Sequence, residues 1–301
     1  MTINRRRAPS SKVSSDKKLG GHQREGDYAT LIGGKVINGT QKGDVKDKIG
    51  NLHSVKSGKK WQVFLYGYER ICESRYLNIL RPCLDAFPKD FNQYVKDRTK
   101  CISFKEGYVK NHGKDATRRL SNEVVIKQLG ANAYVESKNQ LAKTTISTCS
   151  ALKNKDFLHK FLDEALFNSG EVEFLAIKDD TYKKDGLFKI FAREDVLDIL
   201  SSELFPSISI AGRVPEDYNV AGQKTLLCYM KTPVRAKNIV EIEIRNDSRI
   251  HYRQVRFNMY SEDTLSLLID RAQPLPIKYF HENVVVYGKA TLLLKNLLEY
   301  K

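Results

Sequence analysis

Apolar residues near the start of the chain recur at helical spacing. Tyr28, Leu31 and Ile32 stand at positions i, i+3 and i+4 of the segment QREGDYATLIGG. Residues at this spacing share one face of a helix, and glycines directly after the last apolar residue commonly end one. We therefore predict a short helix that begins near Gln23 and ends at Gly33–Gly34.

Short alternating segments follow this helix. KVING, KGDVKDK and LHSVKSG each place apolar beside polar residues over a few positions, which predicts half-buried strands. Gly50–Asn51 supplies a turn before the third of them. WQVFLYG is expected to extend that third strand into an apolar environment, so the predicted order is helix, strand, strand, strand.

The rest of the chain changes character twice. Between residues 73 and 170, segments such as SRYLNILRPCLDAF and NKDFLHKFLDEALFNSG repeat apolar residues at helical spacing. Later segments, among them EVEFLAIKDD, KTLLCYM, IVEIEIRND and HYRQVRFNMY, have the patterns of strands, and SEDTLSLLIDRA predicts a helix capped by Ser261. We predict an α/β (α+β) fold with a central mixed sheet flanked by helices.

The domain layout follows from composition. Residues 1–24 hold seven Lys and Arg against one Asp, among Ser, Gly and Pro, so residues 1–21 are predicted to be a flexible basic arm. Residues 22–301 are expected to form one domain, with core elements at 22–70 and 171–200. A helical insertion is placed at about 73–170 and a DNA-recognition region at 205–301.

Charge narrows the class of partner. The 301 residues carry a formal net charge of +15, which favours a polyanion because a basic surface releases counterions from phosphates. No run of about 18 apolar residues is present, so no membrane span is expected. The five cysteines lack zinc-ligand spacing, and there is no apolar leader, which favours reduced thiols and the cytoplasm.

Asp44 and Lys56 have the side chains that phosphodiester hydrolysis needs. Mg²⁺ takes carboxylate oxygens and several waters, and a lysine beside it adds positive charge at the attacked phosphate and helps to orient or deprotonate water. Because side chains alternate along a strand, Ser54 and Lys56 should share a face while Val55 is buried opposite. We predict that Asp44 and Lys56 face a common Mg²⁺ ion.

Asp44 followed by HSVKSG resembles the PD-(D/E)XK nuclease superfamily, the fold of most type II restriction endonucleases. In that family an aspartate and a D/E-x-K tripeptide lie on neighbouring strands. The resemblance covers residues 22–70 at the level of motifs, and it implies a restriction-endonuclease-like core, Mg²⁺ as cofactor and double-stranded DNA as substrate. Two positions differ, since Gly43 stands where the family has proline and Ser54 stands where it usually has an acid.

The resemblance leaves two candidates for the missing acidic ligand. A helix before the aspartate often supplies one, as in the mismatch-repair nicking endonucleases, which implies Glu25. Restriction enzymes that cut CCGG-type sites are similar in carrying serine-x-lysine, and they recruit a glutamate downstream of the lysine, which implies Glu69. The order of elements favours Glu25. The candidate metal ligands are therefore Asp44, Glu25 and Glu69.

Two further elements complete the candidate site. Gln62 and Tyr66 resemble the Q-x-x-x-Y element of recombination exonucleases, which lies by the DNA end of the site. The candidate catalytic set is thus Asp44, Lys56, Glu25, Ser54, Glu69 and Gln62. Glu241, Glu243 and Arg245 could mimic a second metal site, but a solvated or DNA-facing strand edge is the favoured interpretation.

DNA contacts are predicted from clusters of basic and amide side chains. Arginine can bond guanine in a bidentate manner, and Asn or Gln can do so with adenine, in the major groove. Phosphate contact or salt bridges to nearby acids are the alternative for the segment RNDSRIHYRQVRF. The predicted DNA-binding residues are Lys59, Lys60, Arg245, Asn246, Arg249, His251, Arg253 and Arg256.

These observations lead to one main hypothesis. The chain is expected to be a type II site-specific endodeoxyribonuclease that hydrolyses double-stranded DNA with Mg²⁺, without a small-molecule cofactor and as a symmetric homodimer that matches a palindrome. A repair, recombination or nicking nuclease of the same fold is one alternative. The other is a non-enzymatic DNA-binding protein in which Asp44 and Lys56 have no chemical role.

Overall fold

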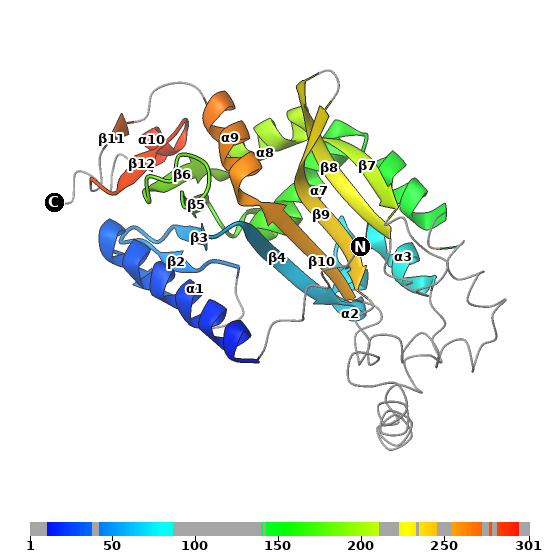
Figure 1. The fold of residues 1–301 in the computed structure, drawn as a ribbon, viewed down its shortest axis with the longest axis horizontal. Helices are drawn as coiled ribbons and strands as arrows, with labels where there is room; N and C mark the ends of the chain where they lie inside the picture. The colour runs from blue at the N-terminus through cyan, green and yellow to red at the C-terminus, as the bar shows by residue number, and fades with distance from the viewer. Residues whose placement is uncertain are drawn as a thin grey trace, which may run out of the picture. The chain divides into compact units, whose positions relative to one another are not determined.

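The computed structural model describes most of the chain, with several gaps. The described residues are 11–37, 42–86, 140, 143–210, 223–232, 235–245, 254–272, 277–278 and 282–294. They form a mixed α/β fold, which confirms the predicted class, with the strands in one mixed and one antiparallel sheet (Figure 1). The chain divides into two compact units, each assembled from separate parts of the sequence, whereas one domain was expected over residues 22–301.

The first unit consists of residues 1–59, 167–199 and 265–301. Its seven strands have the order β1-β2-β3-β5-β6-β12-β11. β3 pairs with β5 and β6 pairs with β12 in parallel, and the other neighbours are antiparallel. The elements are α1 (Ser11–Ile32), β1 (Lys35–Val36), β2 (Val45–Lys46), β3 (Leu52–Lys56), η3 (Asn168–Gly170), β5 (Phe174–Lys178), β6 (Phe188–Ala192), β11 (Ile277–Lys278), β12 (Val284–Val286) and α10 (Ala290–Leu293).

The second unit consists of residues 60–166 and 200–264. It holds an antiparallel sheet of order β4-β10-β9-β8-β7. Its elements are β4 (Lys60–Gly67), α2 (Tyr68–Glu73), η1 (Leu77–Leu80), α3 (Arg81–Asp85), β7 (Phe205–Ile210), β8 (Gln223–Thr232), β9 (Arg235–Arg245) and β10 (Gln254–Tyr260). Three helices each include a boundary between the units: α7 (Lys155–Phe167), α8 (Arg193–Glu203) and α9 (Ser261–Arg271).

Helix α1 ends where the glycine pair predicted. Gly33 adopts a φ of 65°, which glycine tolerates, and its amide donates to Thr30 O while the Gly34 amide donates to Ala29 O. This pair of bonds is a Schellman stop. Gly34 is also required for close approach, since a Cβ there would lie 2.6 Å from Lys46 O. The helix begins at Ser11, however, so part of the basic arm predicted to be flexible at 1–21 is helical, and residues 1–10 lie outside the described part.

The predicted third strand is in fact two strands in two sheets. β3 ends at Lys56, and Gly58, with a φ of 79°, lies in the turn before β4. The apolar segment WQVFLYG forms most of β4, which pairs with β10 in the second sheet. Alternation alone could not separate the two strands, because both are half buried.

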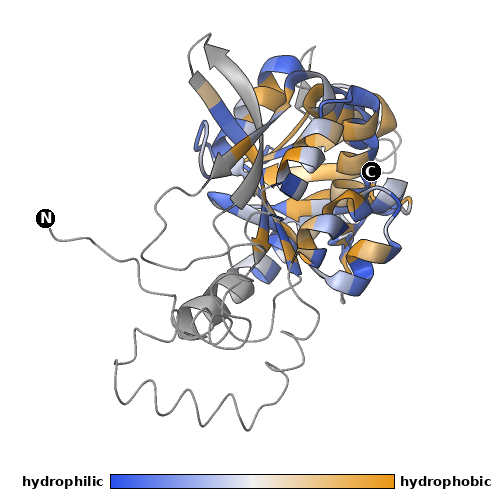
Figure 2. Ribbon diagram, turned by 90° about the vertical axis from the view of Figure 1, so that its right-hand side faces the viewer, coloured by the Kyte–Doolittle hydropathy of each residue, from blue (hydrophilic) through white to orange (hydrophobic). Residues whose placement is uncertain are grey.

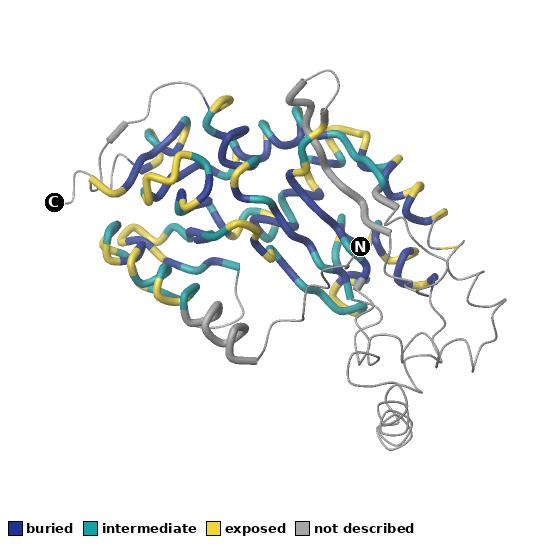
Figure 3. The backbone as a smooth tube through the Cα atoms, viewed as in Figure 1, coloured by how far each residue is buried: buried dark blue, intermediate teal, exposed yellow. Residues whose placement is uncertain are grey.

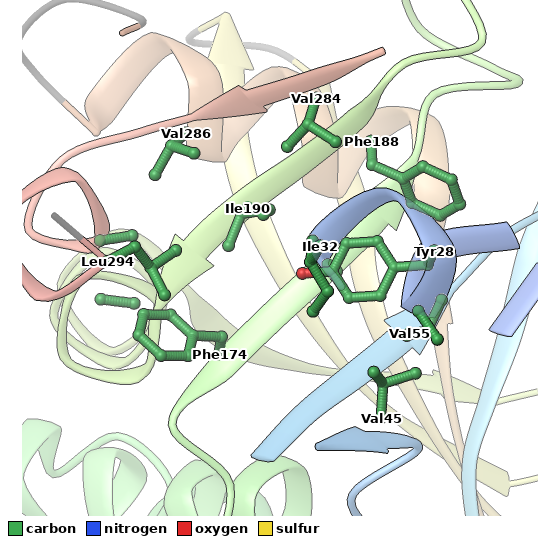
Figure 4. Packing of buried hydrophobic residues seen from close by; sticks show 14 residues of the cluster. Tyr28, Ile32, Val45, Val55, Phe174, Phe188, Ile190, Val284, Val286 and Leu294 are labelled. Carbon is green, nitrogen blue, oxygen red and sulfur yellow. The ribbon is translucent and has the colours of Figure 1, made fainter. Parts of the chain in front are cut away.

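The core of the first unit lies between its sheet and α1. Tyr28 and Ile32 of the helix point toward Val45, Val55 and strand β5 (Figure 4). β5 and β6 are buried along almost their whole length (Figure 3), and the strands inside the molecule are predominantly hydrophobic (Figure 2). Such continuously apolar strands are expected where both faces of a sheet are covered.

The region predicted as a helical insertion is described only in part. Residues 87–139 lie outside the description, and the described remainder includes α2, η1, α3, a helical segment at 143–151 and α7. The carboxylate of Glu164 in α7 accepts hydrogen bonds from the amides of Arg75, Tyr76 and Leu77, and so fixes the chain after α2. The predicted helix at SEDTLSLLIDRA is α9, which begins at Ser261.

Candidate functional site

Asp44 and Lys56 are in direct contact on neighbouring strands. Lys56 Nζ donates to Asp44 Oδ2 at 3.1 Å, and the hydroxyl of Ser54 donates to the same oxygen at 3.2 Å. The amide of Val55 completes the set at 2.6 Å. Three donors from β3 therefore converge on one carboxylate oxygen of Asp44, the residue that immediately precedes β2 in the chain.

The backbone fixes Asp44 in this position. Its amide donates to His53 O at 2.8 Å, and its carbonyl accepts the amide of Ile37 at 3.0 Å. Gly43 precedes it, and a Cβ there would lie 3.1 Å from Leu52 Cβ, tighter than most such contacts in proteins. Glycine at this position therefore allows the close approach of the chain to β3.

The two faces of β3 have different roles. Ser54 and Lys56 project toward Asp44, whereas Val55 belongs to the apolar core, as alternation along a strand requires. The side chains of Asp44 and Lys56 are 21% and 20% exposed. A solute can therefore reach this ion pair, although most of its surface is shielded from water.

A second carboxylate, Asp47, lies on the same strand pair and is fully enclosed. Its Oδ2 is 3.2 Å from Nε2 of His53, and Nδ1 of His53 is 2.8 Å from the hydroxyl of Tyr28. The His53 ring also stacks on Phe174 at 4.7 Å. Asp47, His53 and Tyr28 thus form a buried polar chain that connects the β2–β3 turn with helix α1.

Hydrogen bonds keep the Asp47 carboxylate ionised in this enclosed place. Burial alone would raise its pKa, but bonds from His53 and Asn51 outweigh burial and lower it. Oδ1 also accepts the amides of Ile49, Gly50 and Asn51. Burial, followed by the charge of Asp47, raises the pKa of the Tyr28 hydroxyl well above its ordinary value, so Tyr28 remains neutral.

The chain Asp47–His53–Tyr28 was not assigned from the sequence. The segment DKIGN has an Asp followed by Gly and Asn, which is a signature of a side chain that bonds its own turn. Nothing local indicates that a histidine six residues later and a tyrosine in a helix complete the network. The side chains of His53 and Ser54 point to opposite faces of β3, His53 toward Tyr28 and Ser54 toward Asp44.

Glu25 lies on α1 three residues before Tyr28. Its side chain is 20% exposed, and its Oε2 is 3.1 Å from Nδ1 of His22. The adjacent Arg24 approaches Asp180 at 4.0 Å, just beyond the end of β5. Asp180 lies beside the end of β3 at Lys56, because the parallel strands β3 and β5 pair Lys56 with Ile177. Among the described side chains no hydrogen bond or ion pair joins Glu25 to Asp44 or Lys56, so its role as a ligand stays a prediction.

Glu69 and Gln62 belong to the second unit, whereas Asp44, Ser54, Lys56 and Glu25 belong to the first. Glu69 is exposed in the first turn of α2, and Gln62 is exposed on β4. Tyr66, the other part of the Q-x-x-x-Y element, stacks on Phe64 at 4.2 Å and lies under Arg70 at 3.8 Å. Roles for Glu69 and Gln62 in the site remain predictions.

Lys60, predicted to bind DNA, takes part in a polar cluster that crosses three strands. Its Nζ donates to Glu241 Oε1 at 2.7 Å, and the hydroxyl of Tyr260 donates to Glu241 Oε2 at 3.0 Å. Glu241 is buried, so the expectation of a solvated or DNA-facing position for it is wrong: strand alternation did not reveal the cross-strand partners. Lys59 is exposed at the end of the turn before β4.

The predicted recognition segment is described at its ends only. Arg256 donates to Glu243 across β10 and β9 through Nε, at 3.1 Å, which matches the salt-bridge alternative for this residue. Asn246, Arg249, His251 and Arg253 lie outside the described residues, as does the side chain of Arg245. Their contacts with DNA remain predictions.

A complete metal-binding cluster is not present among the described side chains. No group of three or more His, Cys, Asp or Glu residues in the described part of the chain lies close enough to hold a metal ion. Position 54 contributes a neutral hydroxyl rather than a second carboxylate beside Asp44. Asp44 is the carboxylate of this cluster that could hold an ion, with water or other oxygens completing the shell of the ion.

No family model, curated protein or solved structure gives a significant match to the chain. Among the described helices, none has the length and apolar character needed to cross a membrane. Function must therefore be inferred from the site itself.

Proposed function

We propose that the chain is a Mg²⁺-dependent endonuclease that hydrolyses double-stranded DNA in the manner of a type II restriction enzyme. The observation that carries the proposal is that Lys56 and Ser54 of β3 both donate to Asp44 on the neighbouring strand segment. The Asp44 and Lys56 side chains are partly exposed to solvent. The net charge of +15 supports a polyanionic substrate. The order of α1, β1, β2 and β3, with β5 parallel to β3, is compatible with a restriction-endonuclease-like core.

The donor set at Asp44 fits a hard divalent cation in part. Oδ2 accepts all three bonds from β3, and none of the hydrogen bonds among the described residues reaches Oδ1. Mg²⁺ is commonly held by one or two carboxylates, with water and substrate phosphate completing its shell. When bound, the ion would supply neutralising charge and a more acidic water. Asp44 would hold it, and Glu25 is the proposed second acid.

The chain's own residues then have separate tasks. The ammonium of Lys56 faces the developing negative charge on the phosphate and orients the attacking water. The hydroxyl of Ser54 holds the Asp44 carboxylate and carries no charge of its own. In the reaction a bond forms between the water oxygen and phosphorus, one P–O ester bond breaks, and the water proton ends on the leaving oxygen or in solvent.

The test is cleavage of plasmid DNA by the full chain with Mg²⁺. We expect discrete fragments with Mg²⁺, none with EDTA and none for the Asp44→Asn variant. Sequencing the fragment ends would separate a site-specific cutter, which we expect to act as a symmetric homodimer, from a repair or nicking nuclease without a palindromic site. Equal cutting by Asp44→Asn and the wild type would overturn the assignment.

A non-enzymatic DNA-binding protein is the second candidate. The absence of a three-ligand group among the described residues favours it, because the Asp44–Lys56 contact is then an ordinary salt bridge. In that case several DNAs of different sequence would remain intact with Mg²⁺, while binding to duplex DNA would persist.

A further inference from the structure

The loop after β5 contains three aspartates, and each is engaged within the first unit. Asp179 is fully buried, and its Oδ1 accepts the amides of Tyr182 at 2.9 Å and Lys183 at 3.1 Å. Asp180 lies 4.0 Å from Arg24, and Asp185 pairs with the buried Lys189. The negative charges of this loop are therefore offset by backbone amides or by other cations.

The lysines of the same loop are left without such compensation. Lys183 and Lys184 are exposed, and among the residues that the structure describes no acidic side chain pairs with either. Lys184 has a φ of 57°, unusual for a residue other than glycine, and its amide also bonds Asp179. The loop thus presents two adjacent cations, and their backbone amides are hydrogen-bonded to the buried Asp179.

The position of the loop connects it with the candidate site. β3 and β5 are parallel, and Lys56 is paired with Ile177. The loop therefore begins at the C-terminal end of β5, beside the C-terminal end of β3, where Lys56 lies. The contact between Arg24 and Asp180 connects α1 with this loop, and Glu25 is the residue after Arg24 in the helix. In Figure 1 the strands β3 and β5 are neighbours in the first sheet.

We propose that Lys183 and Lys184 form a phosphate-binding element that contacts the backbone of duplex DNA beside the Asp44–Lys56 site. This inference rests on the proposed function for the identity of the polyanion. Phosphate contacts fix the register of a protein on DNA without specifying sequence. The bonds to buried Asp179 fix the backbone of the loop, so little backbone freedom is lost when its lysines contact phosphate.

The test is the salt dependence of binding to a fluorescein-labelled DNA duplex, measured by anisotropy in EDTA over a series of KCl concentrations. Each lost phosphate contact reduces the slope of log K against log[salt] by about 0.9. We expect the Lys183→Ala/Lys184→Ala variant to bind more weakly and to have a slope about 1.8 less steep than that of the wild type.

The matched control is Lys46→Ala/Lys48→Ala. It removes the same charge from exposed positions of the same unit, but near the start of β3, since Lys46 pairs with Leu52. We expect its slope to stay near that of the wild type. Circular dichroism should show that both variants are folded.

Several outcomes would overturn the proposal: an unchanged slope for the loop variant, an equal change for the control, or a change seen with an RNA duplex and absent with DNA. Failure of the nuclease proposal is distinguishable, because it would appear as intact plasmid with Mg²⁺ while this binding measurement is made without metal. If the protein cuts DNA and the slope is unchanged, only the loop assignment fails.

Discussion

Asp44 and Asp47 lie three residues apart on the same strand pair, yet their surroundings differ in every respect that matters for chemistry. Asp44 is part-exposed, and its three recorded donors all reach one oxygen. Asp47 is fully enclosed, and both of its oxygens accept hydrogen bonds. Oδ1 of Asp44 can therefore accept a further ligand, whereas both oxygens of Asp47 are already hydrogen-bonded.

The two sites show how a structural carboxylate can be distinguished from one that is able to bind a ligand. A structural carboxylate is saturated by its own fold, because an unpaired buried charge is costly. A carboxylate that binds metal must keep a free oxygen and a path from solvent. By this criterion Asp44 is the carboxylate that we propose to be functional, whereas Asp47 connects the β2–β3 turn with α1.

The largest expected effect is on catalysis at Asp44. Asp44→Asn removes the charge that would hold the ion, so we expect cleavage to fall by at least about a thousandfold. The carboxamide oxygen can still accept the Val55 amide, so the midpoint of urea unfolding should change little. Loss of both activity and stability would contradict the separation of roles.

Asp47→Asn should have the opposite profile. It removes a buried charge from a network with His53, so we expect a loss of about 3 kcal/mol in the free energy of unfolding, measured by urea denaturation. Asp27→Asn is the matched control, an identical substitution at an exposed position of α1. Folded Asp47→Asn protein should retain measurable cleavage in Mg²⁺, and a thousandfold loss of activity without loss of stability would refute this division.

Substitutions of Glu25 and Glu69 test which glutamate is the second acid beside Asp44. If Glu25 is the second acid, Glu25→Gln should reduce the rate of plasmid cleavage by about a hundredfold or more, and Glu69→Gln should reduce it much less. Both side chains are polar and accessible, so neither change should alter folding. The reverse result would assign the role of second acid to Glu69 instead.

The smallest expected effect is a dependence of stability on acid pH. The folded-state pKa of Asp47 is lowered, so its stabilising contribution is present above the unfolded value of about 3.9 and is lost as the pH falls through the folded pKa. The midpoint of urea unfolding of the wild type should fall to lower urea concentration below about pH 4. The midpoint of Asp47→Asn should fall less over the same pH range. Parallel curves for the two proteins would contradict the assigned cause.

The sequence located several parts of the fold because their signals are local. The stop of α1 at Gly33 follows from glycine conformation, and the strands β5 and β6 follow from continuous hydrophobicity. The start of α9 at Ser261 coincides with the start predicted for that helix. The break between β3 and β4 was missed, because a half-buried strand has the same pattern in either sheet. The helical start of α1 at Ser11 was missed too, since charged residues conceal its period.

The candidate site divides along the same line. The residue types that could bind a metal and the shared face of Ser54 and Lys56 follow from the sequence alone, because side-chain alternation is a property of the strand backbone. The contact of Asp44 with Lys56, the burial of Glu241 beside the exposed Lys60, and the enclosure of Asp47 with His53 and Tyr28 are visible in the folded structure alone. Such contacts join positions distant in the chain, and their energies depend on burial and saturation of hydrogen bonds, which no local pattern records.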